Sequence, residues 1–326
     1  MPDFALSEFS VSALENPTVI DVTTKGLRER QFRIFLDPFE TYQFQASLEA
    51  DDLTGSSITS DNPVAVVSAC QCASVTIDHG GCDYLVEQMP PVESLGVEYI
   101  LATFPGRING YVYRVIGTSP QATHVELSND DLQIKLQPGD FYEVNVVAEN
   151  EVIKVTSDQP VLVVQYMKGF NGPENDITGD PSMVIVPPVQ MFGKDVAFAL
   201  FEVTSDDTWE YYISATINCD ALQELAMDDQ YMSDWDKISS SDGKICVSRG
   251  PVNPDSVHIV WHSNPTANFF VMVTAQRKSV SYAYPAGYNL EGMSIIKSTS
   301  TVLRNYLILF TFLSHFLKVY VVHNHD

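Results

Sequence analysis

The residues best suited to chemistry are five cysteines in two distant clusters: Cys70, Cys72, Cys82, Cys219 and Cys246. The first cluster, with His79 nearby, has the residue types of a zinc site, but it lacks the paired CxxC motifs that make zinc a strong prediction. Disulfides and unpaired thiols are the alternatives. The odd count leaves at least one thiol outside any internal pair.

Motifs of well-known enzyme classes are absent from the sequence. It contains no GxSxG nucleophile elbow, no HExxH motif, no phosphate-binding glycine loop and no dinucleotide fingerprint. His258 and His262 lie four positions apart in a stretch with a strand pattern. In a strand this spacing places the two side chains too far apart to hold one metal ion easily. We therefore expect no catalytic residue, no cofactor and no resident metal.

The charge of the chain excludes some partners. Asp and Glu number 42 against 18 Lys and Arg, which gives a net charge of −24. Nucleic acid binding needs a cationic surface that displaces counterions, so we expect no nucleic acid partner. Acidic residues cluster at 49–52, 206–207 and 228–236, but none of these clusters has EF-hand spacing. Solvated acidic loops are the better interpretation.

The two ends of the chain carry separate signals. Residues 1–5 lack the charged start and apolar stretch of a secretory signal, so either the protein is cytosolic or its true start lies upstream. Residues 306–322 are apolar but shorter than the roughly 20 residues of a membrane helix. Because the composition changes after Leu290, we expect residues 291–326 to be an unrelated hydrophobic tail, either an anchor or a gene-prediction artefact. A membrane is a partner only if residues 306–322 form a real anchor.

An internal repeat sets the expected organisation of the body, residues 1–290. The segment TSDNPVAVV at 59–67 recurs as TSDQPVLVV at 156–164, a spacing of 97, and the matches continue to Gly96 and Gly193. These segments share 12 identities, where about two are expected by chance. A weaker third copy includes the sequence HSNP, followed by an apolar run. We therefore predict three tandem repeats of about 97 residues: 1–98, 99–195 and 196–290.

The local pattern predicts strands throughout the body. Leu132, Ile134 and Leu136 alternate with polar residues, as in a strand that has one face in a core and the other in water. Residues 161–166 are apolar on both faces, as in a central strand that is covered on both sides. Frequent turn residues between short strands are typical of sandwiches and barrels. The predicted fold class is all-β, with three tandem β-sandwich-like repeats before the tail.

Three motifs in the body occur in the order in which a known family has them. The first reads CDYLVEQMPP, the second DPSM followed by VPP, and the third YPAG. Their residues are Asp83, Leu85, Val86, Glu87, Gln88, Pro90, Pro91, Asp180, Pro181, Ser182, Met183, Pro187, Pro188, Tyr284, Pro285 and Gly287. Together they resemble the IgGFc-binding protein N-terminal domain, over about residues 30–290.

The resemblance implies an extracellular, mucus- or matrix-associated binding protein whose signal peptide is missing from this sequence. It also implies a Cys72–Cys82 disulfide, because the family has cysteines at these two positions and another residue at Cys70. That leaves Cys70 free or intermolecular, with Cys219 and Cys246 as a second candidate pair. No Fc-contacting residue of the family can be assigned to a position in this sequence.

These observations favour a non-catalytic module that binds an extracellular protein or glycoprotein and is either secreted or, alternatively, anchored at the cell surface. One alternative is a structural mucus or matrix component assembled through disulfides, which an unpaired Cys70 favours. Another is a carbohydrate-binding module that uses Trp209, Trp235 and Trp261 as stacking platforms, although tryptophans in β-sandwiches are more often core anchors.

Overall fold

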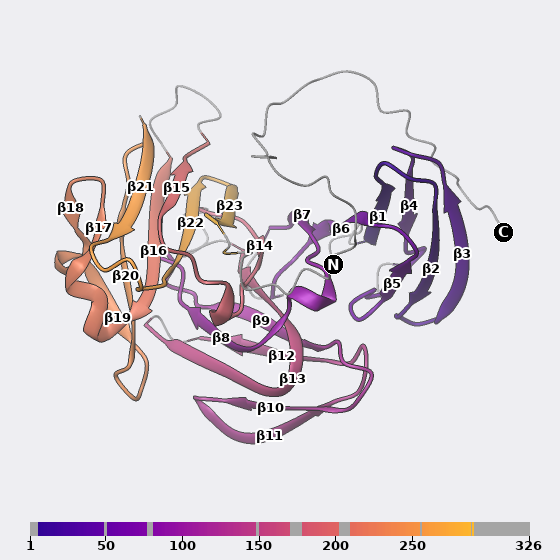
Figure 1. Cartoon of the computed structure of the whole chain (residues 1–326), viewed down its shortest axis with the longest axis horizontal. Helices are drawn as coiled ribbons and strands as arrows, with labels where there is room; N and C mark the ends of the chain where they lie inside the picture. The colour runs from indigo at the N-terminus through magenta and orange to yellow at the C-terminus, as the bar shows by residue number, and fades with distance from the viewer. Residues whose placement is uncertain are drawn as a thin grey trace.

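The computed structural model describes residues 6–48, 51–76, 81–147, 150–169, 178–201, 209–254, 256–287 and 289. Within these ranges the chain forms β-strands and four short 3-10 helices, and the strands build five antiparallel sheets. This confirms the all-β prediction. Figure 1 shows β2–β5, β8–β13 and β15–β22 in three separate places, with β7, β14 and β23 toward the middle.

The first region, residues 7–88, contains a sheet in the order β4-β1-β6-β7 and a sheet in the order β3-β2-β5. Its strands are β1 (Ser7–Ala13), β2 (Thr18–Thr24), β3 (Arg30–Leu36), β4 (Thr41–Gln45), β5 (Ser57–Ser60), β6 (Val64–Ala73) and β7 (Asp83–Gln88). Alternate residues of both sheets meet in one core, as Val11 of β1 and Ile20 of β2 do. The two sheets therefore form two packed layers.

The second region, residues 96–185, forms one seven-stranded sheet around the long strand β13. Its strands are β8 (Gly96–Ala102), β9 (Tyr111–Gly117), β10 (Thr123–Leu127), β11 (Asp130–Leu136), β12 (Phe141–Val146), β13 (Val152–Met167) and β14 (Ser182–Ile185). The first half of β13 pairs with β8 and β10, and its second half pairs with β9 and β14. The register with β8 shifts between Thr156 and Val161, where Pro160 has no N–H to donate. β13 therefore contributes to two layers.

The third region, residues 196–285, contains a sheet in the order β15-β21-β17-β18 and a sheet in the order β19-β20-β16-β22-β23. Its strands are β15 (Val196–Ala199), β16 (Glu210–Asn218), β17 (Leu225–Met227), β18 (Gln230–Tyr231), β19 (Asp236–Ser239), β20 (Ile245–Pro251), β21 (Val257–His262), β22 (Phe270–Arg277) and β23 (Val280–Pro285). The 3-10 helices are η1 (Val92–Ser94), η2 (Val189–Met191), η3 (Cys219–Glu224) and η4 (Met232–Asp234).

The three regions have corresponding strand orders. One layer reads β4-β1-β6-β7, β12-β9-β13-β14 and β20-β16-β22-β23 in the three regions, with β19 added at the edge of the third. The other reads β3-β2-β5, β11-β10-β13-β8 and β18-β17-β21-β15. A shared order of strands is not by itself evidence of common descent. The tandem repeats and their boundaries therefore stay a prediction.

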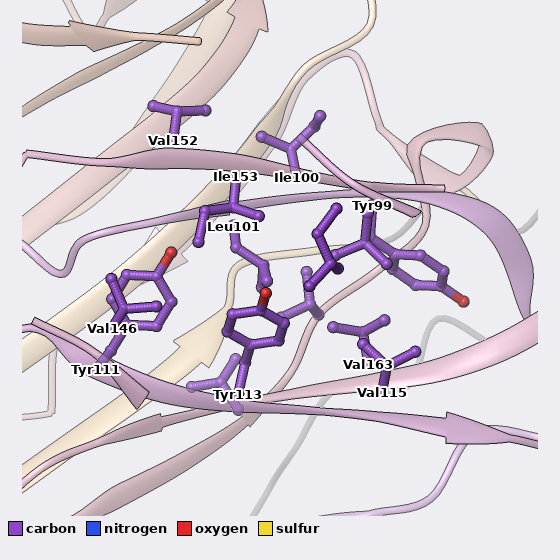
Figure 2. Packing of buried hydrophobic residues seen from close by; sticks show 14 of the residues in the cluster. Tyr99, Ile100, Leu101, Tyr111, Tyr113, Val115, Val146, Val152, Ile153 and Val163 are labelled. Atoms are coloured by element: carbon purple, nitrogen blue, oxygen red, sulfur yellow. The ribbon is translucent and has the colours of Figure 1, made fainter. Parts of the chain in front are cut away.

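The largest core belongs to the second region. Figure 2 shows Tyr99 and Leu101 of β8 directed toward Tyr113, Val115 and Val163 of the opposite layer; all five side chains are fully buried. The outer face of the β8 layer is buried as well, because the same core includes residues of β19, β20, β22 and β23 from the third region. The second and third regions therefore share one core.

One strand departs from its predicted pattern. Ile134 and Leu136 are buried as expected, but Leu132, predicted to lie on the same core face, is 50% exposed. Among the described residues, no helix is both long enough and apolar enough to cross a bilayer. The predicted tail, residues 291–326, lies outside the described residues.

Candidate functional site

The family motifs come together where the three regions meet. The first motif forms β7, the second contains β14 and the third ends β23. β14 lies between the other two strands and contacts both of them. Three motifs that are about 100 residues apart in the sequence therefore line one junction, which we call the motif junction.

Arg107 links the second and third regions at this junction. Its side chain is buried, with only 4% of the residue exposed. The guanidinium donates hydrogen bonds to the carbonyl oxygens of Gly169, at 2.9 Å, and Asp180, at 2.8 Å, and to Ser281 Oγ at 2.8 Å. The backbone N–H of Asp180 also donates to Ser281 Oγ. One arginine therefore fixes the second motif against β23.

Two carboxyl groups of the motif junction have raised pKa values. Burial raises the pKa of Asp180 to about 7, and the nearby Asp83 adds to this increase, whereas Arg107 opposes it. Burial also raises the pKa of Glu87 to about 7, against a hydrogen bond from the backbone N–H of Ile185. Both carboxyls can therefore change charge near neutral pH.

The other motif residues shape the backbone or fill space. Pro91 precedes η1 and Pro188 precedes η2, so both proline pairs lead into a short helical turn. Leu85 is buried, whereas Val86 is 48% exposed. Tyr284 donates a hydrogen bond to the carbonyl oxygen of Ala199, which ties β23 to β15. These motif residues thus shape the backbone, as Pro91 and Pro188 do, or join two strands, as Tyr284 does.

The structure joins Cys72 to Cys82 and Cys219 to Cys246 in disulfides, and Cys70 is a free thiol. Burial raises the pKa of the Cys70 thiol, which lowers the fraction of reactive thiolate. His79 lies outside the described residues. Within the described ranges, no group of three or more His, Cys, Asp or Glu side chains is arranged to hold a metal ion.

The histidines and tryptophans of the third region have structural contacts. His258 bonds through Nδ1 to Asp228 and through Nε2 to the carbonyl oxygen of Asn253, at 2.7 and 2.6 Å. Trp209 is buried against Tyr211, and its ring also faces Arg277. Trp235 packs against the core, and Trp261 donates its indole N–H to a backbone carbonyl. The contacts of the three tryptophans are those of residues that anchor a core, and they differ from the exposed, flat rings of a sugar-stacking surface.

The sequence analysis missed an open groove between the first and second regions. The groove has a volume of about 620 Å³ and follows one side of β11 and β12. Its lining includes Lys25, Asp52, Leu132, Lys135, Asp140 and Phe141. The lining combines charges of both signs with the apolar side chains of Leu132 and Phe141. We call it the β11 groove.

Arg114 of β9 holds the two sides of the β11 groove together. It reaches Asp52 at 2.8 Å and Thr54 at 2.6 Å on the first region, and Glu143 at 2.7 Å on its own region. Its guanidinium also lies 4.5 Å from the centre of the Phe141 ring, a cation–π geometry. No sequence signal marks this groove, because the strand pattern predicts Leu132 to be buried, whereas it is 50% exposed here.

The structure defines an all-β protein of layered antiparallel sheets, closed by two disulfides and joined at a buried junction. Residues 2–275 match the family described as IgGFc binding protein, and the chain belongs to this family. It is 24% identical to the human (Homo sapiens) IgGFc-binding protein over 295 residues, which covers 86% of this chain and 5% of that protein. No solved structure matches the chain.

Proposed function

We propose that this chain is an extracellular module that binds a protein or glycoprotein without chemical turnover. The observation that carries the proposal is the β11 groove, an open surface between two packed regions. Arg114 joins its two sides through Asp52 and Glu143 and so holds them in a fixed geometry. A fixed surface loses little conformational entropy when it binds.

One further observation supports an extracellular role, and a second concerns how fast a partner is bound. Disulfides persist in oxidising compartments, and two are formed here. The net charge of −24 speeds the encounter with cationic partner surfaces, so association slows as salt is added. The human relative is named for binding immunoglobulin Fc; Fc is therefore one probe, beside the proteins of mucus and body fluids.

A second candidate function is covalent assembly into mucus or matrix, and Cys70 is the observation that favours it. The thiol is partly exposed and lies outside both disulfides. Non-reducing electrophoresis of secreted protein tests this function. Disulfide-linked multimers that are lost in Cys70→Ser support assembly, whereas monomers from both proteins exclude it.

The test of binding is capture of partners from mucus, serum and purified Fc by the immobilised chain. Leu132→Glu places a charge in the β11 groove and should abolish capture. Val257→Glu is the matched control, because Val257 is 65% exposed on β21, which lies apart from β11 in Figure 1. Capture that survives Leu132→Glu contradicts binding at the groove. Turnover of a small substrate, lost when one polar residue is changed, contradicts the non-catalytic role.

A further inference from the structure

The three regions contain equivalent turns that are closed by the same backbone hydrogen bond. The strands β1, β9 and β16 have the same place in their regions, and a backbone N–H at or just after the end of each donates to the carbonyl oxygen of a turn residue. These bonds run from Ala13 to Glu40 at 3.0 Å, from Gly117 to Asp140 at 2.9 Å and from Cys219 to Lys244 at 2.8 Å. The three acceptor residues therefore mark equivalent positions.

The residue before each acceptor has a left-handed backbone conformation. The angle φ is 66° at Phe39, 79° at Gly139 and 68° at Gly243. This conformation is unstrained for glycine, but a Cβ atom makes it costly, and a bulky side chain there is an outlier. A Cβ at Gly243 would meet none of the described atoms within 4 Å, so the backbone conformation alone is reason enough for glycine. The first region nevertheless has phenylalanine.

The first region does not use the Phe39 side chain in its core. Phe39 is 73% exposed, and the core cluster built by the described residues of this region does not include it. Its backbone N–H donates to the carbonyl oxygens of Ala13 and Leu14, bonds that glycine would make equally well. Core packing therefore does not offset the strain. Residues held in such conformations concentrate at functional sites.

Acidic side chains surround Phe39 and its neighbour Leu14, which is 43% exposed. The turns 14–17, 37–40 and 61–63 lie at one end of the first region, because β1 pairs with both β4 and β6, and Asn62 donates a hydrogen bond to the Pro17 carbonyl oxygen. We call these three turns the Phe39 tip. Their sequences contain no lysine or arginine, and they carry four exposed acidic residues: Glu15, Asp37, Glu40 and Asp61.

We propose that the Phe39 tip binds a protein partner that has an apolar pocket with lysine or arginine side chains around it. Phe39 and Leu14 fill the pocket, and the acidic side chains face its cationic rim. Aromatic side chains are enriched at the centre of protein interfaces, and the rim of an interface is polar. The acidic residues favour this partner over an anionic membrane surface, which repels them.

This inference rests on the proposed function in one respect, because it takes the partner to be a protein. It assigns the contact to the Phe39 tip instead of the β11 groove. The hydrogen bonds of the Phe39 backbone fix the turn before the partner arrives, so little conformational entropy is lost when the ring enters a pocket. The strained phenylalanine is thus kept for binding and is dispensable for folding.

Two substitutions separate folding from binding. Phe39→Ala removes the exposed ring but keeps the Cβ atom, so the thermal midpoint should stay within about 1 °C of that of the unchanged chain. Phe39→Gly also removes the Cβ atom, and its midpoint should lie about 2 °C or more above that of Phe39→Ala. A clear fall in Phe39→Ala overturns the proposal, because the ring then packs on the chain itself. Equal midpoints of the two variants overturn it as well, because the position then carries no strain.

Photo-crosslinking identifies what the ring contacts. The full chain with p-benzoylphenylalanine in place of Phe39 is irradiated in serum and in mucus, and the same group in place of Tyr231 is the control. Tyr231 is 55% exposed on β18, which lies across the molecule from β3 and β4 in Figure 1. We expect a crosslink to a partner peptide with apolar and cationic residues, in at least about tenfold higher yield than from the control. Equal yields, a peptide without lysine or arginine, or crosslinks confined to this chain or a second copy overturn the proposal.

The crosslinked protein, once purified, is the probe for binding to variants of the full chain. Phe39→Gly should weaken its binding by about tenfold or more, whereas Phe39→Tyr keeps the ring and should bind within about twofold of the unchanged chain. Glu15→Lys should slow association by about twofold or more, and the control Glu126→Lys, at an exposed residue of the second region, should not. Unchanged binding in Phe39→Gly, or equal association rates for the two lysine variants, contradicts the proposed contact.

The outcome is distinguishable from that of the proposed function. Binding that is lost in Leu132→Glu but kept in Phe39→Gly supports the β11 groove and overturns the Phe39 tip. Binding that is lost in Phe39→Gly but kept in Leu132→Glu supports the tip as the contact. Cosedimentation of the chain with phosphatidylcholine vesicles that Phe39→Gly abolishes makes a lipid surface the target and overturns the proposal.

Discussion

The first and second regions have the same strand order, but the cores between their layers differ in cover. In the second region β8 pairs with β13, and Tyr99 fills the space beside Val161 and donates a hydrogen bond to its carbonyl oxygen. In the first region no described strand takes the place of β8, and Val64, the counterpart of Val161, stays partly exposed. One valine in one motif therefore has different surroundings in the two regions.

The difference teaches that a repeated motif does not fix the energetic role of its residues. Hydrophobic stabilisation depends on the apolar area removed from water, so the same side chain contributes more where a further strand covers it. Strands of the third region also cover the outer face of the second region. Among the described residues, the core cluster of the first region includes residues of that region alone. We expect the second region to be the most stable part of the body.

The largest effect is expected from removing the side chain that covers the second core. Tyr99→Ala should lower the free energy of unfolding by about 3–5 kcal/mol, because it leaves a cavity at a fully buried site. Tyr99→Phe should cost about 1–3 kcal/mol, since the Gly96 N–H and the Val161 carbonyl lose their hydroxyl partner. Denaturant unfolding measures both. Tyr231→Ala, at a residue 55% exposed, is the control, and an equal loss there contradicts the comparison.

The next largest effect is expected when either of two arginines that join regions is replaced, and it is measured as a loss of free energy of unfolding. Arg107→Met should cost about 3 kcal/mol, because buried carbonyl oxygens lose a charged donor. Arg114→Met should cost about 1 kcal/mol, since its partners Asp52 and Glu143 remain partly exposed to water. Thermal unfolding of both variants gives the order. A larger loss for Arg114 indicates that the junction of the first two regions is the stronger one.

A matched pair of substitutions tests the comparison directly. Val161→Ala should lower the free energy of unfolding by about 2 kcal/mol, because Val161 is fully buried. Val64→Ala makes the same chemical change at a partly exposed residue and should lower it by less than about 1 kcal/mol. Val163→Ala and Val66→Ala give a second pair with the same expected order. Hydrogen exchange measures the free energy of opening in each region separately, so the loss can be assigned to the region that carries the substitution. Equal losses within both pairs show that the first core is as well covered as the second.

The smallest effect is expected from pH, at the contact between β7 and β14. The pKa of Glu87 is about 7 in the folded protein, above its ordinary value of 4.5. The neutral form is favoured by folding, so this stabilisation is complete below about pH 4.5 and is lost as pH rises through about 7. Glu87→Gln cannot ionise and should reduce the loss of stability between pH 5 and 8 by about 1 kcal/mol. Unfolding curves across this range measure the slope. An unchanged slope, or the same change in the exposed control Glu126→Gln, contradicts the assignment.

Much of the local structure follows from sequence patterns. The alternation of Ile134 and Leu136 with polar residues predicts a strand with one buried face, and both residues are buried. Pro160, which lies within β13, marks where this strand changes register with β8. The family motifs identify residues at the motif junction, such as Glu87 and Asp180, but give no indication that these segments meet.

Other features had no local signal. Arg107 lies outside every motif, yet it bonds to residues about 60, 70 and 170 positions later in the chain. Arg114 is an ordinary strand residue in the sequence, and its partners Asp52 and Thr54 belong to another region. The β11 groove exists only because those regions pack side by side.

The sequence by itself determined the all-β class, the family and the repeated motif that contains Val64 and Val161, because residue type and period of alternation are local properties of a chain. The tertiary structure decided which strand covers each core, where Arg107 finds its acceptors and which valine is buried. These outcomes depend on contacts between distant segments. The burial of a side chain is set by its neighbours in space, and a spacing of 97 residues in a repeat does not specify them.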